Sequence, residues 1–420
     1  MNRLSKNFIS ADLKKELLFF SLAAMLLSLF LSRTALSCSM IAFIILSLIH
    51  TPVKCLFHRF LSAPLLWGMS LLFIIPLISG AWSGNINGWF SIMVTKAPLF
   101  FMPLAFAAPF GFSHKQWKQL GILFITLISA AAAWSLFIYS RDQSLINEGY
   151  LKAGSIPTML DNDRVRFSWL VAIAIMVCIT FIFQKENSKQ EKIPPERYSR
   201  AGIFGLIALG LVFFLHLLAV RTGLISFYIS AIVFAIWMIF RKSAAYSMVI
   251  ILIVLALPLA AYFLLPSFQN RVKFFRYEFP YVKNLSYIPG GNDASRMISL
   301  KAGWEVMNDH PLTGPGLGDI DSSTTAWYNK HYPQMLRHEK IAPSSEWLIY
   351  GLSNGWPGFI AFSAIMLIPF FLPQRKNISW VILSLVTAFS FLFDIGLEVQ
   401  FGVFTYSFVV LCWWKMLKDK

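Results

Sequence analysis

Long apolar segments recur along the whole chain, and they constrain its fold more than any other feature. Of the 420 residues, 57% are hydrophobic and only 13% are charged, which is more apolar surface than a single soluble core could bury. A helix of about 20 apolar residues crosses the hydrocarbon core of a bilayer. The sequence therefore predicts an all-α polytopic integral membrane protein.

Hydropathy divides the chain into about twelve transmembrane helices. The predicted spans are 17–32, 35–50, 65–82, 89–110, 120–140, 165–183, 201–220, 224–240, 246–265, 348–372, 379–394 and 401–416. The first two spans are short, and Arg33 lies between them. We therefore predict a tight helical hairpin there rather than one long helix.

Lysine and arginine are unevenly distributed among the connections between spans. They are frequent near both chain ends and in residues 184–200, and sparse in the alternate short connections. This positive-inside pattern predicts that both termini face the cytoplasm. The net charge of +16 then serves topology and contact with anionic membrane lipids, so we expect no nucleic-acid partner.

One connection is much longer than the others. Residues 266–345 contain three of the seven histidines and nine lysines and arginines, and a loop of this length without a function is uncommon. We divide the chain into a membrane domain with spans 1–9 (1–265), a large, partly helical periplasmic loop (266–345) and a membrane domain with spans 10–12 (346–420).

A glycine-rich stretch in this loop, "NDHPLTGPGLGDIDSS" (308–323), is not a nucleotide-binding P-loop. It follows an amphipathic helix pattern instead of a strand, and it lacks the required lysine. His310 and Pro311 are typical of a helix end, and the glycines Gly314, Gly316 and Gly318 allow a tight backbone path. Physical reasoning alone leaves two interpretations open: a turn that packs on the membrane domain, or a functional motif.

The same stretch resembles the "HP-x-x-G-x-G-x-G" signature of the O-antigen ligase and polymerase superfamily. Further resemblances follow in matching order: "DNDRVRFSWL" (161–170), "AVRTGLISFY" (219–228), "PSSEWLIYGLSNGWPGFIAF" (343–362) and "LEVQFGVFTYSF" (397–408). The resemblance implies a multi-pass protein of the bacterial inner membrane. It further implies a glycosyltransferase that moves a glycan from undecaprenyl diphosphate to an acceptor hydroxyl at the periplasmic face, without cofactor or metal ion.

The acceptor separates two activities within this superfamily. A ligase transfers the glycan to the lipid A core, whereas a polymerase transfers it to another lipid-linked glycan. The resemblance around Glu398 favours the ligase. A secondary transporter or a non-catalytic membrane protein is the competing class, but we find no internal repeat and few intramembrane acids.

Four arginines are candidates to hold the donor diphosphate. They are Arg164, Arg166, Arg221 and Arg296. Guanidinium groups suit this task because negative charge develops on the leaving group. Arg221 is the strongest candidate and is also assigned to catalysis, although it could be a snorkelling anchor.

The other charged candidates have alternatives that the sequence leaves open. Arg164 and Arg166 could form a surface ion-pair cluster with Asp161 and Asp163, and Arg296 could be solvated. Lys96 lies inside span four, where it could pair with Asp394 or Glu398 or extend to the interface.

The acceptor hydroxyl needs a proton acceptor, usually histidine. Ser344 and Ser345 stand where the resemblance expects "H-N". His338, Glu339 and Glu346 are possible substitutes, and we assign the base to His338. Catalysis by leaving-group stabilisation alone, or a diverged and inactive homologue, stays open.

Overall fold

The computed structural model describes residues 10–160, 163–183, 195–241 and 244–419. Asp161 and residues 184–194 of the basic segment lie outside the described residues, as do the side chains of residues 195–200. The described part is built of helices, with no strand. This confirms the all-α polytopic fold expected from the apolar composition.

Most helices of the membrane bundle surround a common apolar core. The bundle helices are α1 (Ala11–Leu31), α2 (Arg33–Leu48), α3 (Val53–Leu61), α4 (Pro64–Ile78), α5 (Ile86–Lys96), α6 (Pro98–Ala107), α7 (His114–Arg141), α8 (Gln143–Gly149), α9 (Arg164–Phe183), α10 (Pro195–Leu218), α11 (Arg221–Phe240), α12 (Ala244–Leu264), α16 (Glu346–Phe371), α17 (Ile378–Leu392) and α18 (Gln400–Lys418). Every predicted span falls in one or two of these helices. The described residues of α5 and α12 contribute no side chain to the common core.

The predicted count of twelve spans is not confirmed. In the part of the chain that the structure describes, eight helical segments are long and apolar enough to cross a membrane, or nine if α2 and α3 form one bent span. Two of the predicted spans are helical but too short to be counted, because α2 has 16 residues and α17 has 15. α1 is long enough with 21 residues, but it is not counted because it carries several charged residues in its first two turns.

The predicted hairpin at the N-terminal end is present. α1 and α2 pack side by side, and Ser32 between them has an extended backbone with φ −167° and ψ 138°. Because this conformation is not helical, the chain reverses here instead of continuing as one helix.

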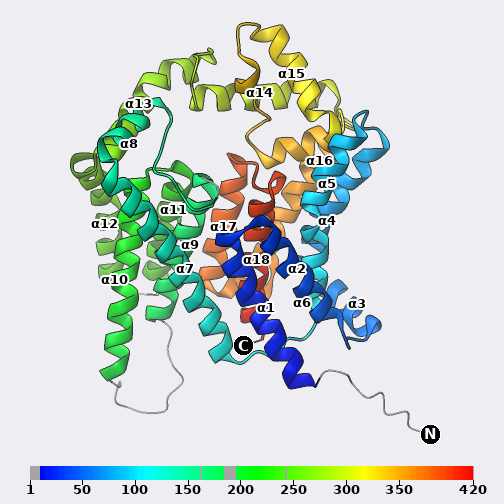
Figure 1. Ribbon diagram of the computed structural model, residues 1–420, viewed down its shortest axis with the longest axis vertical. Helices are drawn as coiled ribbons and strands as arrows, with labels where there is room; N and C mark the ends of the chain where they lie inside the picture. Colours follow the sequence, from blue (N-terminus) through cyan, green and yellow to red (C-terminus); the bar gives the residue numbers. More distant parts are fainter. Residues whose placement is uncertain (1–9, 161–162, 184–194, 242–243, 420) are drawn as a thin grey trace.

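The segment 266–345 folds over one end of the bundle like an arch. It contains α13 (Pro266–Asn284), α14 (Asp293–Asp309) and α15 (Ile320–His331). Figure 1 shows these helices at the top, whereas the start of α1 and the end of α18 lie at the opposite end. A second apolar core, which includes Met93, Met307 and Trp327, joins α14 and α15 to α5 and α16.

The glycine motif fastens this arch to the membrane bundle. α14 ends at Asp309, and the next turn places Gly314 at φ +65° with its α-carbon so close to the Leu352 carbonyl that a Cβ would lie 2.1 Å from the oxygen. The Gly316 N–H donates to the same carbonyl at 3.2 Å. Gly318 meets the Asn85 carbonyl in the same way. The motif therefore packs on the membrane domain, which is the first of its two interpretations.

A cavity lined by arginines

A cavity of about 280 Å³ lies beneath the arch, between α13 and α14 on one side and the outer ends of α9, α11 and α17 on the other. Four arginines line it: Arg164, Arg221, Arg271 and Arg296. Asp293 is its only lining carboxylate among the described residues. Such an excess of cations in a half-closed site favours an anionic ligand.

Arg221 reaches the cavity from the first position of α11. α10 ends at Leu218, and a link of only two residues turns the chain into α11. Gly223 allows α11 to approach α9, because a Cβ there would lie 2.5 Å from the Ser168 Cβ. The Arg221 guanidinium pairs with the Asp293 carboxylate and lies 4.9 Å from the centre of the Phe275 ring.

Arg164 and Arg271 are both oriented by the short segment 153–155. Arg164 Nη1 donates to the Ala153 carbonyl at 2.9 Å and to Ser155 Oγ at 3.1 Å. Arg271 donates to the Gly154 carbonyl and stacks 4.9 Å from the centre of the Tyr150 ring. Burial, reinforced by the neighbouring Arg164 and Arg221, lowers the pKa of Arg271 to about 10. An anion in the cavity would relieve this crowding of positive charge.

Arg296 and Ser344 also line the cavity. Arg296 lies in the first turn of α14, and its Nη1 donates to the Phe393 carbonyl at 3.3 Å. Ser344 lies just before α16, where its N–H donates to Ser299 Oγ at 3.2 Å. The position at which the family resemblance expects a histidine therefore faces the arginines.

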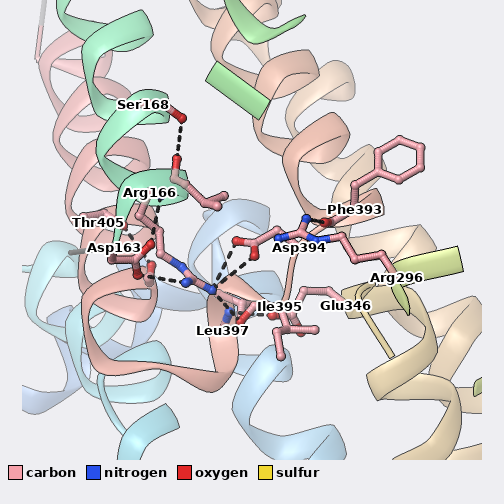
Figure 2. Close-up of polar contacts among 12 residues, drawn as sticks. Asp163, Arg166, Ser168, Arg296, Glu346, Phe393, Asp394, Ile395, Leu397 and Thr405 are labelled. Atoms are coloured by element: carbon pink, nitrogen blue, oxygen red, sulfur yellow. Dashed lines mark hydrogen bonds and ion pairs between the residues drawn. The ribbon is translucent and has the colours of Figure 1, made fainter. Parts of the chain in front are cut away.

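Arg166 has a different environment from the other candidate arginines. Its guanidinium donates to Asp163 at 2.8 Å and to the Ile395 carbonyl at 3.0 Å, and it pairs with Asp394 at 3.2 Å. Figure 2 shows Arg166 between these groups, with Arg296 on the far side of Asp394. Arg166 is not among the residues that line the cavity. It fixes the turn after α17, whose Phe393 carbonyl in turn receives Arg296.

A buried charge cluster lies deeper in the bundle. Lys96 Nζ lies 2.5 Å from Glu398 Oε1 and 5.2 Å from the centre of the Tyr350 ring. This identifies Glu398 as the partner among the two that the sequence allowed. Glu346, at the start of α16, is fully buried and accepts the Leu397 N–H at 2.5 Å. The cluster connects α5, α16 and the segment before α18.

We expect Lys96→Met to destabilise the folded protein strongly, by about 3 to 5 kcal/mol, because it leaves the fully buried Glu346 carboxylate and the half-buried Glu398 carboxylate without a cation. Thermal unfolding of the purified protein in detergent would measure the loss. A matched double variant, Lys96→Met with Glu398→Leu, should recover part of it, since one of the two unpaired carboxylates is gone. Equal unfolding temperatures for wild type and Lys96→Met would contradict the role of the pair.

The remaining predicted site residues lie outside the cavity lining. His338 is exposed in a short 3-10 helix, Arg337–Glu339, and His310 is exposed at the end of α14. Ser345 caps α16. The three glycines of the motif, Glu346 and Glu398 make the packing and polar contacts described above.

Sequence reasoning missed two groups that line the cavity, Arg271 and Asp293. Arg271 shares one face of α13 with Phe275 and Val282, which also line the cavity. The spacing i, i+4, i+11 would have indicated this face. Asp293 directly precedes the predicted loop helix, but no local pattern pairs it with an arginine 72 residues earlier.

Fold and cavity together define a polytopic α-helical membrane protein with an arginine-lined cavity under the folded segment 266–345. Residues 205–363 match the family model described as O-antigen ligase. This match confirms the resemblance of this stretch to the O-antigen ligase superfamily, which is associated with the transfer of lipid-linked glycans. The matched stretch includes Arg221, Arg271, Asp293, Arg296 and Ser344. No curated protein matches the chain.

Proposed function

We propose that this protein is a glycosyltransferase of the O-antigen ligase type, which moves a glycan from undecaprenyl diphosphate to a hydroxyl of the lipid A core at the periplasmic face. The observation that carries the proposal is the convergence of four arginines from α9, α11, α13 and α14 on one cavity. A donor diphosphate provides the negative charge that this cavity lacks. The proposal needs no metal ion, because the guanidinium groups supply the positive charge.

The step of this reaction exchanges one bond for another. The bond between the sugar C1 and the diphosphate oxygen breaks, and its electron pair stays on the diphosphate, where Arg221 and its neighbours stabilise it. The acceptor oxygen forms the new bond to C1 and gives up its proton. Preorganised arginines suit such a transition state, since their charge is in place before the leaving group develops its own.

Asp293 is the group that the geometry favours as proton acceptor. Its carboxylate lines the cavity and pairs with Arg221, which is the position that the donor diphosphate would occupy. Once phosphate oxygens replace it at the guanidinium, the carboxylate is free to take the acceptor proton. His338, proposed from the sequence, is exposed and outside the cavity lining, so its participation would require a movement of residues 332–345.

A lipopolysaccharide gel of a deletion strain tests the activity. Loss of the whole ladder, with accumulation of lipid-linked polymer, is the result expected for a ligase. A single-repeat band would instead assign the alternative, a polymerase whose acceptor is another lipid-linked glycan. An unchanged ladder would remove both and favour a transporter or a non-catalytic role.

The proposal requires that residues 266–345 face the periplasm, and cysteine labelling should show this. In a variant without the four native cysteines, a cysteine at the exposed position Ser322 on α15 should react with a membrane-impermeant reagent in intact spheroplasts. A cysteine at Lys376, exposed on the turn between α16 and α17, is the matched control and should react only after lysis. The reverse pattern would exclude the proposed orientation.

A further inference from the structure

A second charged cavity lies at the other end of the bundle. It has a volume of about 410 Å³ and is lined by α3, the link between α6 and α7, and the last turns of α18. Three of its lining residues are cations: Arg59, Lys415 and Lys418. This end also holds the start of α1 and lies opposite the arch (Figure 1), so the cavity is separate from the proposed glycan-transfer site.

Lys415 is buried at this cavity without an acidic partner in contact. The residue is only 5% exposed, and its Nζ donates to the carbonyls of Phe106 at 3.2 Å and Ala108 at 2.9 Å. These bonds use two of the three ammonium protons. Among the residues that the structure describes, none of the three cations forms an ion pair. Asp419 also lines the cavity. The described lining therefore holds three cationic side chains and one carboxylate, which is an excess of positive charge.

The helix that carries Arg59 has the character of an interfacial helix. α3 turns by 110° from α2, and Val53, Phe57 and Leu61 form an exposed apolar stripe at spacing i, i+4, i+8. An amphipathic helix of this kind lies in the plane of the membrane surface with its apolar side in the acyl region. Arg59 is then held at the depth of the lipid headgroups.

Aromatic side chains complete the second cavity. Lys415 Nζ lies 4.8 Å from the centre of the Phe110 ring, and Lys418 Nζ lies 4.9 Å from the centre of the Trp414 ring. Tryptophan is enriched at the boundary between headgroups and acyl chains. This arrangement keeps the ammonium groups near the membrane surface and leaves space between them and Arg59.

We propose that this cavity binds a phosphate group, and that the phosphate belongs to an anionic phospholipid of the leaflet opposite the arch. Three cations around a space at headgroup depth suit a negatively charged phosphodiester. The interfacial helix beside it favours a lipid over a soluble ion, because a lipid can place its acyl chains against the exposed stripe while its phosphate reaches Arg59. This inference does not depend on the glycosyltransferase activity.

Thermal unfolding of the full-length protein in detergent tests the site, with short-chain phosphatidylglycerol, short-chain phosphatidylcholine and inorganic phosphate as probes. Phosphatidylglycerol should raise the unfolding temperature more than phosphatidylcholine does. Arg59→Gln and Lys418→Gln should each weaken phosphatidylglycerol binding by about tenfold, the loss expected for one charge-assisted contact. Lys54→Gln removes the same charge from an exposed position of α3 outside the cavity and should leave binding unchanged.

Three outcomes decide the source of the phosphate and the existence of the site. Binding of inorganic phosphate that is weakened by Arg59→Gln, without an effect of phosphatidylglycerol, would support a phosphate site but assign it to a soluble ion. Equal stabilisation by both lipids would overturn the proposal. Equal weakening of phosphatidylglycerol binding by Lys54→Gln and Arg59→Gln would overturn it too, because only general surface charge would then be involved.

Discussion

Asp293→Asn should lower glycan transfer by about 100- to 10,000-fold, the usual effect of removing a general base. The amide keeps the size of the side chain and can still contact Arg221, but it cannot accept the acceptor's proton. Transfer from a lipid-linked donor by the purified protein would measure the rate. Donor binding should persist or become tighter, since the carboxylate no longer competes with the diphosphate for the Arg221 guanidinium.

His338→Ala is the decisive comparison for this assignment, because the sequence favoured His338 as the base. It should transfer at close to the wild-type rate if Asp293 takes the proton. The opposite result, with Asp293→Asn active and His338→Ala inactive, would return the role to His338. Full activity of both variants would mean that stabilisation of the leaving group by the arginines carries the reaction alone.

Arg221→Lys should lose most of the transfer activity while the protein still folds. Lysine keeps the charge but offers no planar pair of N–H donors to a diphosphate. Loss of one hydrogen bond between charged groups costs about 1.5 to 3 kcal/mol. This corresponds to roughly a 10- to 150-fold decrease in kcat/KM. Kinetics of the purified variant with a lipid-linked donor would measure the decrease.

Arg141→Lys is the matched control for Arg221→Lys. Arg141 is exposed at the end of α7 and stacks over the Phe137 ring at 5.9 Å, away from the cavity. Its replacement should leave kcat/KM unchanged. Similar losses in both variants would reduce Arg221 to a general contributor of surface charge, and near-normal transfer by Arg221→Lys would make it a membrane anchor.

The sequence predicts the helices well because membrane helices depend on local composition. Each predicted apolar run is helical, and the end of α14 at Asp309 follows from the His-Pro pair after it. The number of spans is harder to predict. Short helices such as α2 and α17 become stable through packing in the bundle, and hydropathy does not measure packing.

The candidate site shows the same division between local and long-range information. Arg221 stands out locally, because it is a single charge between two apolar runs. Arg164 and Arg166 are two residues apart on one helix turn, yet one lines the cavity and the other pairs with Asp394, 228 residues later in the chain. Only the tertiary arrangement separates their roles.

The arch formed by residues 266–345 rests on both sides of the bundle. α13 contacts α10 and α12, whereas α14 and α15 contact α16. The four cavity arginines project from α9, α11, α13 and α14. Four like charges push these walls apart, and Asp293 balances only one of them. A diphosphate bound between the four arginines would neutralise their repulsion. Binding of the donor lipid should therefore stabilise the contact between the arch and the bundle, and release of the diphosphate should weaken that contact.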